Sequence, residues 1–247
     1  MGAQAMIGTL INTAAIIVGG GAGLIIKHRL GESMQDSLLK ALGLATLFIG
    51  ASGALTGLLA VTDQGSLTTK GAMIMIISLV IGTIIGELLK IEHRLNQLGE
   101  KMRILIKADS NSSFANGFVT NTLVVCVGAM AVVGSIEEGM TGDFSTLFAK
   151  AMLDCIITLI FASTLGIGVL FSAIPLLLYQ GSITLLANVV SPFFSETLIN
   201  NLSFVGSVLI FAIGLNLILN SKIKVGNMVP ALLVPIVIEF VQKLIQM

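Results

Sequence analysis

Charged side chains are scarce in this chain of 247 residues: Asp, Glu, Lys and Arg together make up 11%, against roughly 25% in a soluble domain. Aromatic residues make up 5%, with no Trp and a single Tyr. The 13 basic and 13 acidic residues balance, so nothing indicates nucleic acid or another polyanion as a partner. Hydrophobic residues make up 55%, and the mean hydropathy is +1.02. Several apolar runs exceed the ~18 residues needed to cross a bilayer, which predicts a protein whose main partner is the lipid bilayer.

Cysteine and histidine are also rare, and their positions exclude familiar catalytic and metal-binding motifs. Cys126 and Cys155 fall in predicted helices, where they are expected to pack as small apolar residues. His28 and His93 lie in basic segments. The chain has no His-Glu-x-x-His or Cys-x-x-Cys motif and no intramembrane aspartate pair of the protease type. We therefore expect no enzyme activity, no metal site and no cofactor.

Hydrophobic runs predict an all-α polytopic membrane protein with about eight transmembrane helices. Their approximate bounds are residues 7–26, 38–61, 71–89, 114–136, 149–171, 174–194, 197–219 and 226–246. The two runs between residues 149 and 194 are the least regular, because Pro175 and the stretch Tyr179, Gln180 and Gly181 interrupt them. They form either two spans or one broken, re-entrant segment, and the second reading leaves seven spans.

Basic residues cluster in three of the connecting segments, which sets the orientation. One cluster follows the first span, the largest follows the third, and the last precedes the eighth: Lys27 and Arg29; Lys90, Arg94, Lys101, Arg103 and Lys107; Lys222 and Lys224. With eight spans all three lie on one side, and the positive-inside rule makes that side cytoplasmic. The opposite loops carry mainly acidic residues: Asp63, Glu137, Glu138, Asp143 and Glu196. Both termini are then expected outside the cytoplasm.

One pattern occurs twice within predicted helices: a Gly, then Asn-Thr four residues later, then Val-Gly and Ala. The copies comprise Gly8, Asn12, Thr13, Val18, Gly19 and Ala22, and Gly117, Asn121, Thr122, Val127, Gly128 and Ala131. In each copy the Gly, Asn and Gly share one face of a helix. Because an odd number of spans separates the copies, they enter the membrane from opposite sides. This arrangement is typical of secondary transporters built from inverted repeats.

The duplication divides the chain into two membrane repeats. The first, residues 1–108, contains three spans and a basic amphipathic segment, and the second, residues 109–247, contains four or five spans. A polar linker at residues 109–113 marks the boundary. Apolar residues of the segment 90–107 recur at helical spacing among bases. The segment is either a helix that lies on the inner leaflet or an extension of the third span.

The Asn-Thr pairs and their glycines are the candidate substrate- or ion-binding residues: Asn12, Thr13 and Gly19, with Asn121, Thr122 and Gly128. An Asn side chain offers both a carbonyl and an amide, and inverted repeats bring equivalent residues to a site near the bilayer midplane. The alternative is that each Asn joins two helices through a hydrogen bond of roughly 0.5–2 kcal/mol.

Two carboxylates are candidates for coupling transport to an ion. Asp154 lies about one turn inside the fifth predicted span, where an ionisable group usually faces a polar cavity or a partner. The alternative is a pair with Lys150, four residues earlier, near the outer interface. Glu239 follows Pro235 by one turn in the last span and is the second candidate.

Glycine supplies candidate hinges and packing faces. The interruption at Tyr179, Gln180 and Gly181 fits either a hinge that lines the site or a plain interfacial turn. A run of three glycines in the first span offers a point where that helix can unwind. Three Gly-x-x-x-Gly pairs allow close helix packing: Gly19 and Gly23, Gly53 and Gly57, and Gly82 and Gly86. The first two pairs fit either a homodimer face or contacts within the chain.

Four stretches of the chain carry a family resemblance. They are residues 7–20 (IGTLINTAAIIVGG), 126–130 (CVGAM), 179–182 (YQGS) and 224–231 (KVGNMVPA). In this order and combination they resemble a bacterial membrane family, domain of unknown function 554 (the YdfK/YqgA-like proteins), from residue 6 to the C-terminus. The resemblance implies a bacterial inner-membrane protein, loosely labelled as a transport protein, and implies no substrate or mechanism.

These features favour a multi-pass inner-membrane transporter of a small solute or ion, with its site near the bilayer midplane. The alternative is a membrane scaffold or sensor that acts through residues 90–107. The two hypotheses differ in the interior. A transporter needs a hydrated cavity that reaches Asn12 and Asn121, whereas a scaffold is dry there.

The orientation predicts which engineered cysteines react in intact cells. Single cysteines at positions 62–68 and 141–144 should react with a membrane-impermeant thiol reagent, because both segments face outward. Cysteines at positions 97–101 should react only after the cells are lysed. Gel shifts with a mass tag measure the labelled fraction, and the reverse pattern would contradict the orientation.

Overall fold

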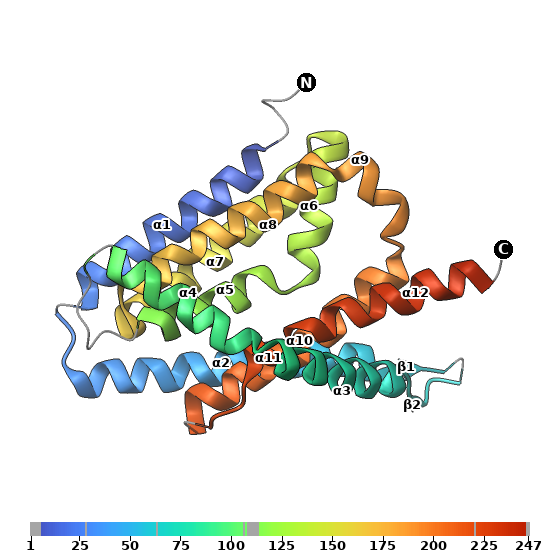
Figure 1. Ribbon diagram of the computed structural model, residues 1–247, viewed down its shortest axis with the longest axis horizontal. Helices are drawn as coiled ribbons and strands as arrows, with labels where there is room; N and C mark the ends of the chain where they lie inside the picture. Colours follow the sequence, from blue (N-terminus) through green and yellow to red (C-terminus); the bar gives the residue numbers. More distant parts are fainter. Residues whose placement is uncertain are drawn as a thin grey trace. The chain divides into compact units, whose positions relative to one another are not determined.

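The computed structural model describes residues 6–27, 29–62, 64–105, 107, 114–219 and 221–245. The predicted linker at residues 109–113, His28 and Asp63 lie outside the described residues. Regular structure in the described part is helical apart from one short hairpin (Figure 1). In chain order the elements are α1 (Ile7–Lys27), α2 (Glu32–Leu58), β1 (Leu59–Val61), β2 (Leu67–Thr69), α3 (Ala72–Leu89), α4 (Ile91–Leu105), α5 (Phe114–Cys126), α6 (Ala129–Thr141), α7 (Ser145–Leu165), η1 (Ile167–Ser172), α8 (Ala173–Leu185), α9 (Ala187–Val190), η2 (Ser191–Phe193), α10 (Glu196–Leu219), α11 (Val225–Met228), η3 (Val229–Leu232) and α12 (Leu233–Ile245).

Six helices of the described part are long and apolar enough to cross a membrane: α1, α2, α3, α7, the segment Ile167–Leu185 and α10. The helices α5 and α6 form a pair bent by 60°, which makes a seventh span if the pair crosses together. Val225–Val241 is a shorter apolar helix in the region of the last predicted span. The prediction of an all-α polytopic membrane protein is therefore confirmed.

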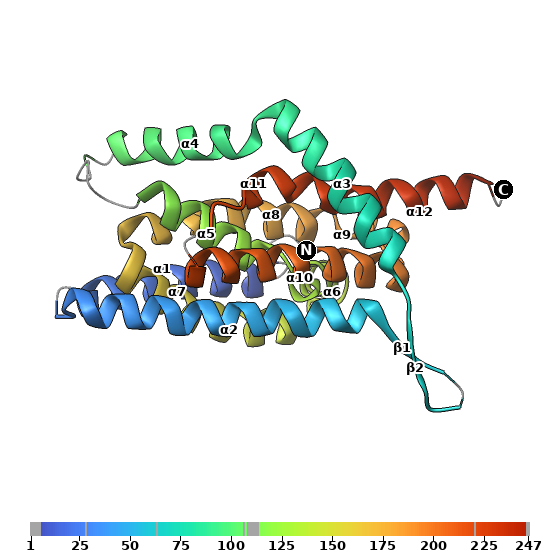
Figure 2. The same ribbon diagram turned by 90° about the horizontal axis from the view of Figure 1, so that it is seen from below.

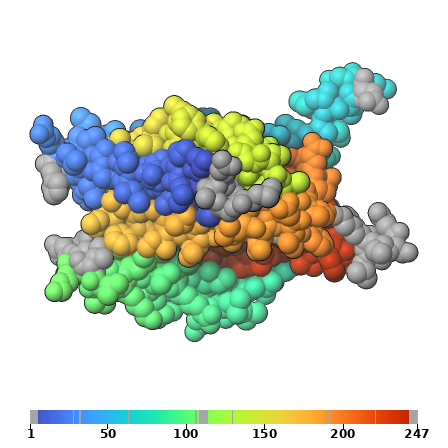
Figure 3. Space-filling view, turned by 90° about the horizontal axis from the view of Figure 1, so that it is seen from above, coloured from blue at the N-terminus to red at the C-terminus, as the bar shows by residue number. Residues whose placement is uncertain are grey.

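The hairpin is the element that the hydropathy pattern does not predict. Its strands pair antiparallel, with Leu59 opposite Thr69, and the Thr62 N–H donates to the Ser66 carbonyl across the turn. Figures 2 and 3 show it projecting where the chain passes from α2 to α3. The second predicted span therefore ends as a strand, so its last apolar residues do not extend the helix.

The chain divides into two compact units, each built from separate segments. Unit 1 comprises Met1–Leu42 and His93–Phe194, and unit 2 comprises Gly43–Glu92 and Ser195–Met247. Each unit thus combines residues of both predicted repeats. The predicted boundary at residue 108 concerns a duplication of sequence, not a packing unit, and it stays a prediction.

In unit 1, α1 packs along α7 through its glycines (Figure 1). A Cβ added at Gly19 would lie 2.3 Å from the Cys155 carbonyl oxygen, and one added at Gly23 would lie 2.2 Å from the Leu159 carbonyl oxygen. Only glycine permits two helix backbones to approach so closely, and such packing drives helix association in lipid. The helix stays intact through its glycine run, so the predicted unwinding at this point is wrong.

The other two Gly-x-x-x-Gly faces are filled within unit 2. Gly53 and Gly57 of α2 face Ser207 and Phe204 of α10. On α3, Gly82 faces Ala231 and Gly86 faces Asn227, which lie in η3 and α11. All three glycine faces therefore contact helices of the same chain, and a homodimer would have to use another surface.

Helix breaks occur at glycines other than the predicted ones. The helix α8 is continuous through Tyr179, Gln180 and Gly181, so the predicted hinge there is wrong. The actual breaks are at Gly128 (φ 142°, ψ 154°), between α5 and α6, and at Gly166 (φ 86°, ψ −159°), before η1. Both conformations are open to glycine and strained for other residues. The prediction that Gly128 continues one helix face is also wrong.

The basic amphipathic segment forms a helix of its own. Lys90 ends α3 in a left-handed conformation (φ 52°, ψ 45°), and α4 starts at Ile91. The interpretation as an extension of the third span is therefore wrong. On α4, Gly99 packs against Ala115, whereas Leu98 and Leu105 are exposed.

The α1–α7 contact predicts opposite effects for two nearby glycines. Gly19→Ala should lower the free energy of unfolding by about 1–3 kcal/mol, because the added methyl overlaps the α7 backbone. Gly21→Ala is the matched control: a Cβ there meets no atom within 4 Å, and Ala favours a helix by up to ~1 kcal/mol. Thermal unfolding of the purified protein in detergent distinguishes them, and equal melting temperatures would contradict the contact.

Candidate functional site

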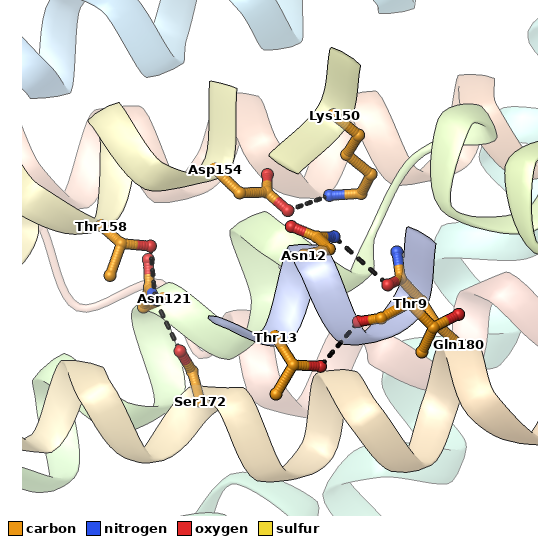
Figure 4. A network of polar contacts seen from close by, with 9 residues as sticks. All are labelled: Thr9, Asn12, Thr13, Asn121, Lys150, Asp154, Thr158, Ser172 and Gln180. Carbon is orange, nitrogen blue, oxygen red and sulfur yellow. Dashed lines mark hydrogen bonds and ion pairs between the residues drawn. The ribbon is translucent and has the colours of Figure 1, made fainter. Parts of the chain in front are cut away.

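Unit 1 contains a buried polar network at the interface of α1, α7 and α8. Asn12 on α1 donates from Nδ2 to Oε1 of Gln180 on α8, at 3.2 Å, and both side chains are fully buried. Beside them, Lys150 and Asp154 of α7 form an ion pair in which both side chains are almost inaccessible. Asn12 points toward Asp154 (Figure 4). We call these four residues the Asn12 layer.

The second repeat asparagine builds its own group of polar contacts, the Asn121 layer. Asn121 on α5 donates from Nδ2 to Oγ of Ser172 at 2.6 Å and to Oγ1 of Thr158 at 3.2 Å. Asn121, Thr158 and Ser172 are all fully buried. Thr158 lies one turn beyond Asp154 on α7, so the face of one helix joins the two layers (Figure 4).

Four hydrophobic residues form an apolar layer between the two asparagines: Ile16, Val125, Ala173 and Leu176. Ile16 follows Asn12 by one turn, and Val125 follows Asn121 by one turn. The two aliphatic side chains meet in this layer, whereas the asparagines lie on opposite sides of it. The helices α1 and α5 therefore run in opposite directions.

A buried carboxylate, Glu138 of α6, lies at the start of α1. It accepts hydrogen bonds from the backbone N–H of Gly8, from both the N–H and the hydroxyl of Thr9, and from the hydroxyl of Thr184. The first N–H groups of a helix have no partner within it and carry partial positive charge. Glu138 thus caps α1 with a charge from another helix.

The burial of Glu138 overturns its assignment to an outer loop, since only 1% of its surface is exposed. A signal was present in the sequence: Ala131, Ser135 and Glu138 recur at helical spacing, and all three are buried. The acidic neighbour Glu137 obscured it by making the segment look like a solvated loop.

The remaining candidate residues are dispersed. The Thr13 hydroxyl donates to the Thr9 carbonyl of its own helix. The Thr122 hydroxyl is buried without a partner, and Tyr179 is half-buried on α8. Glu239 is half-buried on α12, in unit 2 and thus outside this network.

Three buried amide atoms of the network have no hydrogen-bond partner: Oδ1 of Asn12, Oδ1 of Asn121 and Nε2 of Gln180. A buried polar group without a hydrogen bond costs about 1–3 kcal/mol. Within the described ranges, no cluster of three or more His, Cys, Asp or Glu side chains is arranged to hold a metal ion. The network can therefore offer hydrogen bonds and one pair of opposite charges.

The Glu138 cap predicts a loss of stability on neutralisation. Glu138→Gln should lower the free energy of unfolding by about 1–3 kcal/mol, because charge-assisted bonds to Gly8 and Thr9 are weakened. Glu137→Gln is the matched control, since Glu137 accepts a hydrogen bond from the Thr146 hydroxyl rather than from the backbone N–H groups of α1. Melting temperatures of the two purified variants provide the comparison, and an unchanged value for Glu138→Gln would refute the cap.

Comparison with known proteins places this chain in a family. The family described as "Protein of unknown function (DUF554)" matches residues 7–240. "Uncharacterized membrane protein YdfK" of Bacillus subtilis (strain 168) is 35% identical over 236 residues, which cover 96% of each chain. "Uncharacterized protein YqgA" of Escherichia coli (strain K12) is 33% identical over 232 residues, 92% of this chain and 94% of the relative. No solved structure matches. Together with its long apolar helices, these matches show that the chain is a multi-pass membrane protein belonging to the family described as "Protein of unknown function (DUF554)".

Proposed function

We propose that the protein is an inner-membrane transporter of a small solute or ion, with its site in the polar network of unit 1. The observation that carries this proposal is the layered interior: polar Asn12 and Asn121 layers on either side of one apolar layer. Such an arrangement suits a path with two binding positions and a gate of one helical turn between them. The apolar layer is the gate in this proposal.

The energetic cost of the network supports a functional role. An ion pair within an apolar bundle gains little net stability over a hydrophobic pair of similar volume, because both charges lose their hydration. Lys150 and Asp154 are nevertheless buried together, beside amide atoms that have no partner. Intramembrane charges are usually found where a substrate or ion passes.

An inverted repeat fits the same layers. The two Asn-bearing helices run in opposite directions, and the residue one turn after each Asn enters the shared apolar layer. The helix of the second copy is broken at Gly128, and discontinuous helices at the repeat interface are typical of transporter sites. In this proposal Asn12 and Asn121 bind the substrate in turn. Asp154 is the main coupling carboxylate, and Glu239 is the second candidate.

The helix α4 supports the scaffold or sensor function as the second candidate. Leu98, Ile104 and Leu105 are exposed on a helix that also carries three bases, Arg94, Lys101 and Arg103, and Lys90 immediately precedes it. Such a helix suits the anionic inner surface of a membrane. A transporter can carry this helix too, so the interior of unit 1 decides between the functions.

The asparagines test the transport proposal. Asn12→Ala and Asn121→Ala should each abolish the stabilisation of the purified protein by its substrate, in addition to the lower melting temperature without substrate that follows from the lost hydrogen bonds to Gln180 and Ser172. A screen of inorganic ions and small metabolites by thermal shift identifies compounds that stabilise the wild-type protein. Asn96→Ala, on the exposed face of α4, is the control variant.

A structural role for the asparagines gives a different result. No compound of the screen then stabilises the wild-type protein, and the alanine variants show only the lower melting temperature that follows because Gln180 and Ser172 lose their partners. If this occurs, the transport proposal fails.

A further inference from the structure

We propose that the Asn12 layer binds a small zwitterion, a molecule such as an α-amino acid that carries one ammonium and one carboxylate. The proposal rests on the transport function proposed above and specifies its substrate class. The Lys150 ammonium and the Asp154 carboxylate are paired with each other. When a zwitterion enters, its carboxylate pairs with Lys150 and its ammonium with Asp154.

Charge balance distinguishes this class from simple ions. The Lys150–Asp154 pair is buried, with 8% and 6% of the two side chains exposed. A cation that binds Asp154 leaves the Lys150 ammonium unpaired in an apolar interior, and an anion that binds Lys150 leaves Asp154 unpaired. An uncompensated buried charge is strongly unfavourable. A zwitterion is the ligand that separates the pair and still leaves each charge with an opposite partner.

The amide side chains of Asn12 and Gln180 also favour a zwitterion as the ligand. One hydrogen bond joins Asn12 to Gln180, and it uses one amide N–H donor and one amide carbonyl. The bond leaves one carbonyl and one amide nitrogen without a partner, here Oδ1 of Asn12 and Nε2 of Gln180. If both amides were turned over, the Asn12 amide nitrogen would donate to Asp154, and the Gln180 carbonyl would be the free acceptor. The free acceptor suits an ammonium, and the free donor suits a carboxylate.

The ionisable groups near the Lys150–Asp154 pair do not supply a new partner for either charge when the pair is separated. Cys126 of α5 lies close enough to interact electrostatically with Lys150 and Asp154, and Tyr179 of α8 interacts with Cys126. Glu138 of α6 already receives four hydrogen bonds at the start of α1. Lys150 therefore keeps Asp154 as its partner until a ligand supplies another carboxylate.

The height of the layer limits the size of the ligand. Thr9 and Thr184 lie about one turn to one side of it, and Ile16 and Leu176 lie one turn to the other. One turn of helix rises about 5.4 Å. A ligand that separates the pair within this spacing would be about the size of an amino acid with a small side chain.

The experiment measures the melting temperature of the purified full-length protein with matched probes at equal ionic strength. The zwitterions are glycine, alanine, serine, β-alanine and glycine betaine, and the half-molecules are methylammonium chloride and sodium acetate. At least one zwitterion should raise the melting temperature in a saturable way. Each half-molecule at the same concentration should give less than a tenth of that shift. An equal shift with methylammonium, sodium ions or acetate overturns the proposal, and so does the absence of a shift with every zwitterion.

Two variants test whether the rise in melting temperature arises from binding at the Asn12 layer. Lys150→Met with Asp154→Leu removes both charges together, so no charge is left unpaired, and the zwitterion shift should disappear. Gln180→Met keeps the ion pair and should weaken binding at least tenfold, which provides a readout if the double variant does not fold. Asp36→Asn with Lys40→Gln neutralises an exposed pair of the same i, i+4 spacing and should leave the shift intact. A shift that persists in both layer variants overturns the proposal.

Failure of this inference is distinguishable from failure of the transport function. If an ion or an uncharged metabolite, and no zwitterion, stabilises the protein through Asn12 and Asn121, transport stands and the substrate class is wrong. If no compound of either panel binds and the asparagine variants are unstable, both proposals fail.

Discussion

The close approach of α1 to α7 is the contact on which the candidate site depends. Gly19 and Gly23 let the two backbones touch at the carbonyls of α7, and side chains one or two turns away are held in register as a result. Asn12 is thereby brought beside Asp154, a partner more than a hundred residues further along the chain. Lipid supplies no hydrophobic force between helices, so this geometry depends on glycine.

Charge is distributed in unit 1 so that each buried ionic group is balanced within about one helical turn. Asp154 is paired with Lys150 on the same helix. Glu138 is balanced by the positive end of α1 and by the hydroxyls around it. The two carboxylates differ in whether a ligand can replace their partner. A helix end cannot be exchanged for a ligand without loss of the cap, whereas a lysine–aspartate pair can be opened by a molecule that offers both charges.

Features set by local periodicity could be predicted from the sequence, and features set by packing could not. The helical faces of Asn12 and Asn121 and the pairing of Lys150 with Asp154 follow from 3.6 residues per turn. The burial of Glu138 depends on which helices surround α6, so its charge alone was misleading. Gly181 resembled a hinge, yet α8 continues through it without a break. Gly166, where the chain does break, lies two residues before Gly168 in a predicted span, and the sequence does not distinguish it from the glycines that pack within intact helices.

In the proposed transporter, the two polar layers are reached from opposite sides of the membrane, and the apolar layer separates them. Single cysteines at Ser172, Leu176 and Thr184, in a chain with Cys126 and Cys155 replaced by Ala, test this arrangement in membrane vesicles of known orientation. A small impermeant thiol reagent should label position 184 from one side and position 172 from the other, and it should leave position 176 unlabelled. If all three positions stay unlabelled from both sides, although the unfolded protein reacts, the interior is dry and the account is contradicted.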